Sequence, residues 1–241
     1  MREAARLVAG AKRIVAFSGA GMSQESGIPT YRGSDGMWKE YDPQKYANIS
    51  FFRKDPTYFW SFFRDVRYRT LVNSSPNEGH LALARLEERG VLRAVITQNI
   101  DGLHRTAGSS NVIELHGNTR VIGCLECDAD YDYEAIAKRV KEGEVPPRCD
   151  RCGGLLKPRV TFFGEALPEG AMENAAHESS NCDLMIVVGS TLEVFPAASC
   201  PLIAKRSGAK IVIVNVGKTA MDELADVLID GKAGEILPRI I

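Results

Sequence analysis

Six short apolar runs rich in β-branched residues recur along the chain, and segments with a helical pattern separate most of them. A strand that is buried on both faces reads as a continuous apolar run, so these runs predict a parallel β-sheet. Alternating strands and helices predict the α/β class, with a doubly wound, Rossmann-like sheet whose ligands bind beyond the carboxyl ends of the strands. The six runs are Arg13–Phe17, Ala94–Thr97, Val112–Leu115, Leu184–Val188, Lys210–Val214 and Val227–Ile229.

Two helices have recognisable boundaries in the sequence. The run Ser75-Pro76-Asn77-Glu78 has the form of a capping box with proline at the first helical position. It predicts a helix that continues through His80–Arg89 and ends at Gly90, a residue suited to a left-handed terminator. A second helix is expected to start near Pro196 and to end before Gly208.

Two segments interrupt the alternation of strands and helices. Residues 36–72 carry an aromatic-rich helical pattern that starts at Asp55-Pro56. Residues 119–158 carry four cysteines and one short helix, Glu134–Lys141. We expect these two segments to form a small second domain against the large one. The apolar side of the aromatic helix consists of Phe59, Trp60, Phe62, Phe63 and Val66.

The four cysteines form two C-x-x-C pairs, Cys124 with Cys127 and Cys149 with Cys152, separated by 21 residues. Each pair presents two thiolates on one side of a tight turn, which is typical of a tetrahedral zinc site. The sequence thus predicts a zinc-binding module at 119–158 and a helical module at 36–72. The remaining parts are assigned to one discontinuous Rossmann-like domain: 1–35, 73–118 and 159–241.

Length and charge limit the possible classes of protein. The 241 residues can bury one large core and a smaller module, and the net charge of −1 gives no reason to expect nucleic acid as the main partner. No apolar run approaches the roughly 20 residues that span a bilayer, so no membrane partner is expected. The N-terminal segment lacks a signal-peptide core, which favours a cytoplasmic protein, where paired cysteines bind metal rather than form disulfides. Cys182 and Cys200 lie in apolar surroundings and are expected to be packing residues.

Small residues follow the first predicted strand, in the run Ser18-Gly19-Ala20-Gly21-Met22-Ser23. Such a run lets backbone N–H groups approach a pyrophosphate, but it also suits a tight turn between a strand and a helix. The G-x-G-x-x-G pattern is incomplete because residue 24 is Gln24, and no acidic strand end follows about 20 residues later. The run therefore argues against an ordinary NAD-dependent dehydrogenase.

Polar residues also follow the other strands. Gln98-Asn99-Ile100-Asp101 comes directly after the second strand, where it suits a ligand contact or an Asx turn that opens a helix. His116, followed by Gly117, ends the third strand and suits either proton transfer at neutral pH or a structural role. Ser190 and Asn215 follow later strands, at positions where a phosphate or a ribose can be bound.

Taken together, these motifs resemble the sirtuin family, the NAD-dependent protein lysine deacylases, over nearly the whole chain. They are, in chain order, Gly19–Ser23 with Gly27–Arg32, Thr97–Asp101, His116-Gly117, the two C-x-x-C pairs, Pro158–Glu165, Gly189–Val194 and Asn215. The resemblance implies removal of acetyl groups from lysine side chains with NAD as co-substrate, which yields nicotinamide, O-acetyl-ADP-ribose and free lysine. It also implies one structural Zn²⁺, since four thiolates leave no open coordination position.

The resemblance assigns a role to each motif. His116 acts as general base on a ribose hydroxyl, and Asn99 is the second catalytic residue. The acetyl-lysine peptide inserts as an added strand between two chain segments, Val160–Glu165 and Leu192–Val194. The residues implied for NAD are Gly19, Ala20, Gly21, Ser23, Tyr31, Arg32, Gln98, Asn99, Asp101, Gly189, Ser190 and Asn215. Those implied for the peptide are Val160, Phe162, Gly164, Glu165 and Val194, and those for zinc are Cys124, Cys127, Cys149 and Cys152.

Three departures from the family pattern bear on specificity. Tyr31 replaces the usual phenylalanine, and Ser190-Thr191 has its two hydroxyl residues in the reverse of the commoner order. Family members that remove acidic acyl groups use a Tyr-x-x-Arg pair in the aromatic helix, where this chain has Phe63 and Val66. If that helix is regular, Arg64 and Arg67 point about 100° away from those positions. We therefore expect acetyl-lysine to be preferred over succinyl-lysine.

Two other functions fit part of the sequence. The same NAD pocket would also support ADP-ribose transfer to a protein, although His116 and the predicted acyl-lysine tunnel favour deacylation. The cysteine segment alone resembles a zinc ribbon that binds nucleic acid. Its seven basic residues are matched by eight acidic ones, which does not make a phosphate-binding face.

Overall fold

The computed structural model describes residues 1–30 and 36–241, except the side chains of Trp38, Arg67, Arg69 and Val72. Its main sheet has six parallel strands in the order β3-β2-β1-β7-β8-β9. This order confirms the predicted doubly wound sheet. The chain adds strands outward from β1 on one side and outward from β7 on the other, so the topological switch point lies between β1 and β7. Such sheets bind their ligands at this point. The six strands, which coincide with the predicted runs to within two residues, are β1 (Ile14–Ser18), β2 (Leu92–Thr97), β3 (Val112–Glu114), β7 (Leu184–Val188), β8 (Lys210–Asn215) and β9 (Val227–Asp230).

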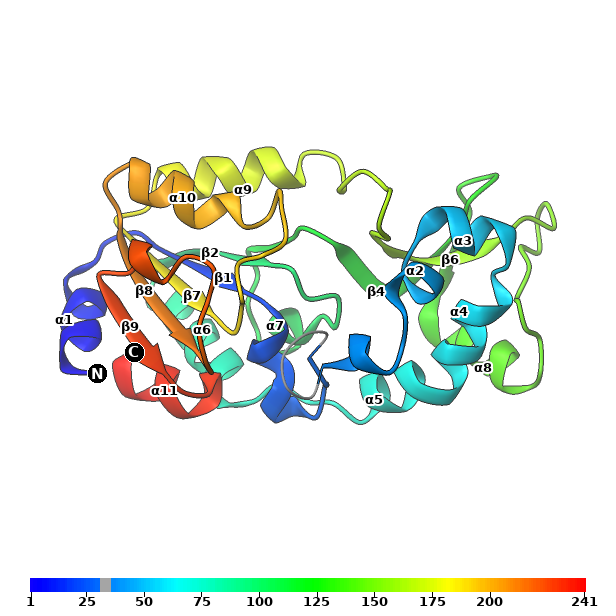
Figure 1. Cartoon of the computed structure of the whole chain (residues 1–241), viewed down its shortest axis with the longest axis horizontal. Coiled ribbons are helices and arrows are strands. Elements are labelled where there is room, and N and C mark those ends of the chain that lie inside the picture. The colour runs from blue at the N-terminus through cyan, green and yellow to red at the C-terminus, as the bar shows by residue number, and fades with distance from the viewer. Residues whose placement is uncertain (31–35) are drawn as a thin grey trace.

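Helices cover both faces of the main sheet (Figure 1). One face packs against α1 (Arg2–Gly10), α6 (Glu78–Glu88) and α11 (Ala233–Ile240) in a single apolar core. The other face packs against α9 (Ala171–Ser180) and α10 (Ser199–Arg206) in a second core. Because both faces are covered, the central strands are mostly apolar and buried, which is why they read as continuous runs.

The main sheet and its helices occupy one end of the molecule, at the left of Figure 1, and a small domain occupies the opposite end, at the right. It contains an antiparallel sheet in the order β5-β4-β6, built from β4 (Gly117–Cys124), β5 (Asp130–Asp132) and β6 (Leu156–Val160). Its helical elements are α2 (Pro43–Tyr46), α3 (Ile49–Lys54), α4 (Thr57–Phe62), η3 (Phe63–Arg67), α5 (Tyr68–Val72) and α8 (Tyr133–Lys141). The other short elements of the chain are η1 (Ala20–Ser26), η2 (Met37–Lys39), α7 (Leu103–Thr106) and η4 (Asp222–Leu224).

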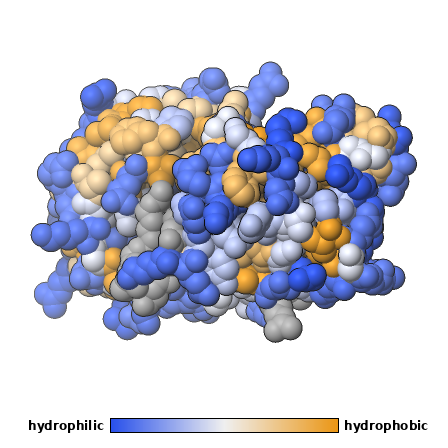
Figure 2. Space-filling model, turned by 45° about the vertical axis from the view of Figure 1, so that its right-hand side comes forward, coloured by the Kyte–Doolittle hydropathy of each residue, from blue (hydrophilic) through white to orange (hydrophobic). Residues whose placement is uncertain are grey.

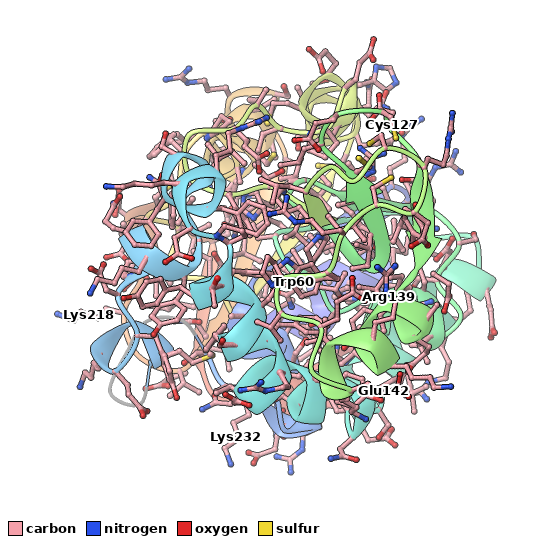
Figure 3. All side chains as sticks on the ribbon, turned by 90° about the vertical axis from the view of Figure 1, so that its right-hand side faces the viewer. Trp60, Cys127, Arg139, Glu142, Lys218 and Lys232 are labelled. Carbon is pink, nitrogen blue, oxygen red and sulfur yellow. The ribbon has the colours of Figure 1, made fainter. Side chains whose placement is uncertain are left out.

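The aromatic helices and the cysteine segment share one hydrophobic core. Trp60 is fully buried at its centre, and its indole N–H donates a 3.1 Å hydrogen bond to the carbonyl of Leu156 on β6. Figure 3 views this domain end-on, with Trp60 near the middle and Cys127 at one edge. Both segments contribute to it, with Phe52 and Trp60 from one and Ile136 and Leu156 from the other.

Three local predictions were wrong. The capping residue of α6 is Asn77 rather than Ser75, and its box partner is His80, whose Nδ1 accepts the Asn77 N–H. Asn77 is favoured because its Nδ2 also donates to the carbonyl of Met22, which anchors the start of the helix to η1. Residues 196–198 form a turn, and α10 begins only at Ser199.

The third wrong prediction concerns the aromatic helix, which is not regular. Residues 63–67 form a π-helix, so successive side chains do not follow the 100° spacing assumed from the sequence. The prediction that Gly90 ends α6 in the left-handed region is correct, with φ of 75°. Within the described residues, no helix is long and apolar enough to cross a membrane.

Candidate active site

A cleft of about 680 Å³ opens between the carboxyl ends of the main sheet and the small domain. This volume is typical of cofactor and small-molecule sites. Ser23 and Asp101 line a small adjoining pocket that they share with Asn99. Tyr31 and Arg32 lie outside the described residues. The other predicted NAD, peptide and catalytic residues line the main cleft together: Gly19, Ala20, Gly21, Gln98, Asn99, His116, Val160, Phe162, Gly164, Glu165, Gly189, Ser190, Val194 and Asn215.

The glycines after β1 and β7 allow two chain turns to pack in direct contact. The N–H of Gly21 donates to the carbonyl of Gly189 at 2.9 Å. A Cβ on Gly21 would lie 2.8 Å from the Cα of Gly189, and a Cβ on Gly189 would lie 2.2 Å from the nitrogen of Met22. The tight-turn reading of this motif is therefore correct. It also allows a phosphate to approach closely, because Gly19, Gly21 and Gly189 line the cleft without side chains, but their N–H groups already donate to the carbonyls of Val188, Gly189 and Val214.

Ser190 has a hydroxyl proton available to a ligand. Its Oγ accepts hydrogen bonds from Gln98 Nε2 at 3.0 Å and from the Leu192 N–H at 3.2 Å. A hydroxyl has two acceptor lone pairs and one proton, so these two bonds leave the proton for an acceptor in the cleft. A phosphate oxygen is such an acceptor. Thr191, the other hydroxyl of the reversed pair, instead donates to Glu193 at 3.0 Å.

Asn215, at the end of β8, offers a ligand a hydrogen-bond acceptor, whereas Ser190 offers a donor. Its Nδ2 donates to the carbonyls of Val216 and Gly217, both at 3.1 Å. Both of the donor hydrogens of the amide are thus used within the chain, and Oδ1 is left as an acceptor. An acceptor of this kind suits a sugar hydroxyl.

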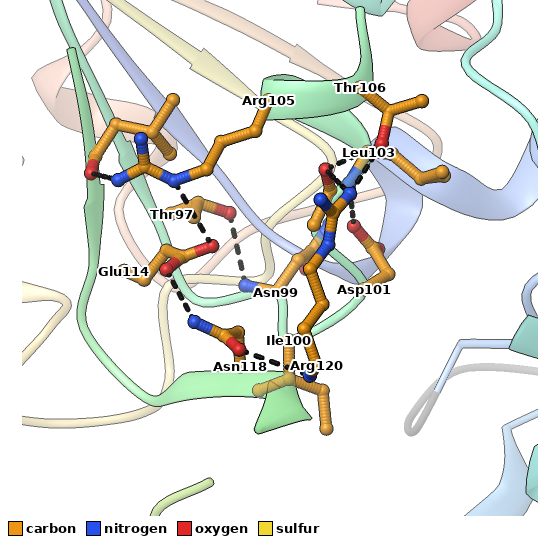
Figure 4. Close-up of polar contacts among 12 residues, drawn as sticks. Thr97, Asn99, Ile100, Asp101, Leu103, Arg105, Thr106, Glu114, Asn118 and Arg120 are labelled. Atoms are coloured by element: carbon orange, nitrogen blue, oxygen red, sulfur yellow. Dashed lines mark hydrogen bonds and ion pairs between the residues drawn. The ribbon is translucent and has the colours of Figure 1, made fainter. Parts of the chain in front are cut away.

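Asn99, Ser23 and Asp101 form one hydrogen-bonded group. The Asn99 Nδ2 donates to Ser23 Oγ at 3.1 Å, and Ser23 Oγ donates to Asp101 Oδ2 at 2.7 Å. Asp101 Oδ1 also accepts the Leu103 N–H at 2.9 Å, which is the Asx-turn contact considered from the sequence (Figure 4). The side-chain orientation of Asn99 is therefore fixed from behind.

Two buried histidines, His80 and His104, lie behind this group. The Nδ1 of His80 accepts the Asn77 N–H, so Nε2 carries the proton and points at Ser23 Oγ, 3.5 Å away. His104 Nε2 lies 2.9 Å from Ser18 Oγ. Burial lowers the pKa of His80 to about 4, against a smaller opposing effect of Asp101, and burial also lowers the pKa of His104. Both rings are therefore neutral at pH 7, and no sequence signal distinguishes them from surface histidines.

His116 has a defined tautomer. Its Nδ1 lies 3.0 Å from the carbonyl oxygen of Gln98. A carbonyl can only accept, so Nδ1 carries the proton and Nε2 has a free lone pair. Burial lowers the pKa of His116, and the bond to Gln98 opposes that shift only in part. A half-buried, neutral imidazole with a free Nε2 is suited to act as a general base.

Polar contacts frame the turn that carries His116 (Figure 4). Asn118 Nδ2 donates to Glu114 Oε2 at 2.9 Å, and Asn118 Oδ1 accepts the Arg120 N–H at 3.0 Å. The Arg120 guanidinium donates to the carbonyl of Gly102 at 2.9 Å, in the loop after β2. The His116 turn and the loop of Asn99 are thus tied to each other outside the cleft.

The peptide side of the cleft contains a buried lysine that the sequence analysis missed. Lys157 is 5% exposed, and its Nζ lies 2.9 Å from Glu165 Oε2. Burial lowers the pKa of Lys157, and the Glu165 carboxylate partly restores it. The predicted peptide residues Val160, Phe162 and Glu165 surround this pair. The sequence offers only a weak signal, since Lys157 follows two leucines in the run Leu155–Val160, which also contains Pro158 and Arg159.

Aromatic rings form the wall of the cleft on the small domain. Phe59, Phe62 and Phe63 line it from α4 and η3. Among the described residues, Lys232 is the one lysine or arginine that lines the cleft, and its Nζ lies 3.7 Å from Glu235. Arg64 pairs with its neighbour Asp65 at 2.7 Å. Figure 2 shows a mainly hydrophilic surface with apolar residues gathered in separate patches.

The four predicted metal ligands come together at the edge of the small domain. The ligand atoms of Cys124, Cys127, Cys149 and Cys152 all lie within 4.8 Å of one another, with Sγ–Sγ distances of 3.5 Å for Cys124–Cys152 and 3.6 Å for Cys127–Cys149. Tetrahedral zinc with Zn–S bonds of about 2.3 Å requires sulfurs about 3.8 Å apart. The donor set therefore fits one Zn²⁺ with every position filled by thiolate. Tyr131 supports it through a 3.2 Å contact of its hydroxyl with Cys149 Sγ.

Known proteins are similar to this chain in sequence and in fold. The sequence model of the Sir2 family matches residues 19–196. NAD-dependent protein deacylase 2 of Archaeoglobus fulgidus is 48% identical, over 100% of this chain and 94% of its own length. A Sir2 structure with a deacetylated p53 peptide and 3′-O-acetyl ADP-ribose is 42% identical, with a TM-score of 0.95 over 100% of this chain and 96% of that one. The structure of Sir2Af2 with a myristoylated histone peptide is also 42% identical, with a TM-score of 0.83 over 99% and 93%.

Fold and site together define an α/β enzyme with a dinucleotide-type cleft and a structural zinc centre in a separate small domain. The family match covers well over half of the sequence, and the alignment to the Archaeoglobus relative covers the full length of this chain. The chain belongs to the Sir2 family of NAD-dependent protein deacylases.

Proposed function

We propose that this protein removes acetyl groups from lysine side chains of proteins, with NAD as co-substrate, at the cleft between its two domains. The products are free lysine, nicotinamide and O-acetyl-ADP-ribose. The observation that carries the proposal is the tautomer of His116, whose free Nε2 belongs to the same cleft as the glycine turns and Ser190. A general base is thereby combined with groups that suit a dinucleotide.

NAD fits the residues at the main-sheet end of the cleft. Gly19, Ala20 and Gly21 would face its pyrophosphate, the Ser190 hydroxyl would donate to a phosphate oxygen, and Asn215 Oδ1 would accept from a ribose hydroxyl. Gln98 and Gly189 would complete this end, and the sequence motif adds Tyr31 and Arg32. When bound, NAD supplies the ribosyl carbon that takes up the acyl oxygen as nicotinamide leaves.

The catalytic groups of the chain are held before any ligand binds. Asn99 would orient the nicotinamide end, since its amide is fixed through Ser23 to Asp101. His116 Nε2 would remove a proton from a ribose hydroxyl, an effect worth about 10²–10⁴ in rate. Because the Gln98 carbonyl fixes the ring, little ordering is required at the moment of reaction.

The peptide would enter as an added strand between the segments Val160–Glu165 and Leu192–Val194, next to the lining residues Phe162, Gly164 and Val194. The main-chain groups of Phe163 already pair with residues 47–49, so the peptide would pair beyond them, from Gly164 onward.

We also propose the domain limits 1–35, 73–118 and 159–241 for the NAD-binding domain, 36–72 for the helical module and 119–158 for the zinc module. The separate cores of the main sheet support the division between the NAD-binding domain and the two modules, which share one core of their own. Four thiolates leave zinc no open position, so its role would be structural. A cytoplasmic location is proposed because a reducing compartment keeps these thiols able to bind metal.

A second candidate activity is the removal of longer aliphatic acyl groups. The aromatic wall of Phe59, Phe62 and Phe63 would bury an acyl chain, at about 0.8 kcal/mol per CH₂ group. The structure of Sir2Af2 with a myristoylated histone peptide supports the idea. The test is kcat/KM on one peptide sequence that carries acetyl, butyryl or myristoyl lysine. A steady fall in kcat/KM with chain length would exclude this activity.

Mass spectrometry of an acetyl-lysine peptide, incubated with the protein with and without NAD, tests the main proposal. We expect the acetyl mass to be lost from the peptide only with NAD, and acetyl-ADP-ribose to appear. An increase in peptide mass by one ADP-ribose unit, with the acetyl group retained, would instead establish ADP-ribosyl transfer.

A further inference from the structure

We propose that Lys157 is a positioning residue for the acyl-lysine peptide, because it holds the turn that forms one edge of the peptide site. This inference rests on the proposed function, since it concerns how that substrate is bound. Lys157 lies in β6 and does not line the cleft itself.

The ammonium group of Lys157 is buried at the centre of the turn. Its Nζ donates to the carbonyl of Val160 at 2.5 Å and to that of Pro158 at 3.2 Å, and it lies 4.3 Å from the centre of the Phe162 ring. Together with Glu165 at 2.9 Å, these groups surround a charge that would otherwise be very costly to bury. The site is therefore built around a positive charge.

The partner carboxylate holds the peptide edge directly. Glu165 Oε2 also accepts the Phe162 N–H at 2.8 Å, and the Glu165 N–H donates to the Phe162 carbonyl at 3.0 Å. These bonds close a turn around Gly164, whose φ is +90°. Glu165, predicted from the sequence as a peptide contact, has its carboxylate bound within the chain. Its position depends on Lys157.

The other side of the turn is tied to the helical module. The Phe163 N–H donates to the carbonyl of Ala47 at 2.7 Å, and the Ile49 N–H donates to the carbonyl of Phe163 at 3.1 Å. The turn is thus held on one side by neutral backbone pairs and on the other by the Lys157–Glu165 pair. Loss of the ammonium would leave the Glu165 carboxylate without its counter-charge and release it toward water. The peptide edge would then lose its shape, while the distant turn at Gly19 and Gly21 would keep its own contacts.

The substitution Lys157→Met tests this inference, since it leaves an unbranched side chain only one atom shorter and removes the ammonium group. We expect the Kd of a fluorescent acetyl-lysine peptide and the peptide KM to rise at least about tenfold, with kcat and the NAD KM within about twofold of the wild type. Lys157→Arg should restore most of the affinity. The matched control is Lys138→Met, at an exposed lysine on α8 that pairs with Glu142, and it should bind peptide normally.

A double-mutant cycle shows whether Lys157 acts through Glu165. Glu165→Gln and Lys157→Met should each weaken peptide binding, and the double variant should be no weaker than the worse single variant. Should Lys157→Met not fold, Lys157→Gln, which also removes the charge but can still donate to the Val160 carbonyl, carries the same test through its peptide Kd. Unchanged peptide Kd in the variants, or an equal loss of peptide and NAD affinity, would overturn the inference. Wild-type protein that binds peptide but does not deacetylate it would refute the proposed function and leave the Kd comparison intact.

Discussion

The Nδ1 of His116 lies 3.0 Å from the carbonyl oxygen of Gln98, which fixes the imidazole as the tautomer with a free Nε2. His116 lies two residues beyond the end of β3 and Gln98 directly follows β2, so the orientation of the ring depends on the pairing of these two strands. Gln98 in turn donates to Ser190 at the end of β7. The proposed base and the proposed phosphate contact are therefore linked through one residue.

The pH dependence of kcat/KM should follow the ionisation of His116. Burial lowers the pKa of His116 below its ordinary value of 6.5, and the base is active only when neutral. The rate should therefore rise with pH along an acidic limb whose apparent pKa is below 6.5, and it should be level near pH 7. Steady-state kinetics between pH 5 and 8 measure this limb. A limb centred above pH 7 would mean that His116 is not the titrating base.

The stability of the fold should fall as the pH drops from 6.5 toward 4. Burial lowers the pKa of His80 to about 4, so in this window the unfolded chain binds protons that the folded chain does not. The free energy of unfolding then rises with pH across the window, and the contribution of His80 is on the order of 3 kcal/mol. Urea unfolding at several pH values measures it. His80→Gln should reduce the slope and leave the share of the buried His104, whereas the control His177→Gln, at an exposed histidine, should keep the full slope; equal slopes in both would contradict the assignment.

Removal of one zinc ligand should unfold the small domain. In Cys149→Ser the remaining three thiolates hold zinc weakly, and binding and folding are coupled at such sites. We expect metal analysis to find much less than one zinc per chain and the near-ultraviolet signal of buried Trp60 to be lost. Cys182→Ala is the control, because this cysteine lies outside the cluster and should leave the zinc content unchanged. Full zinc content in Cys149→Ser would show that Cys149 is not a ligand.

Acetyl-lysine should be preferred over succinyl-lysine by at least about tenfold in kcat/KM, or about 1.4 kcal/mol. A succinyl carboxylate must lose its water shell next to the wall of Phe59, Phe62 and Phe63. The one described lysine at the cleft, Lys232, has Glu235 as its neighbour. Kinetics on one peptide that carries either acyl group decide the point. Equal succinyl turnover would mean that a cation reaches the tunnel, and the π-helical turn at residues 63–67 is where to look for it.

The positions of the strands were predictable because the central ones are buried on both faces and therefore read as apolar runs. The cysteine cluster was predictable because its spacing follows from ligand geometry. The role of Lys157 was not, since a lysine in a strand gives no sign of whether a partner eight residues later will meet it. The π-helix and the Asn77 cap were missed for a similar reason. Both depend on tertiary contacts, such as the bond from Asn77 to Met22, that local patterns do not contain.

The most direct test of the account compares two products of one reaction. Wild-type protein, an acetyl-lysine peptide and NAD should give equal molar amounts of nicotinamide and deacetylated peptide. His116→Ala should lower the rate of deacetylation by about 10²–10⁴ while the zinc content and unfolding free energy stay near the wild-type values. Deacetylated peptide formed without nicotinamide, or near-wild-type turnover by a folded His116→Ala variant, would contradict the account.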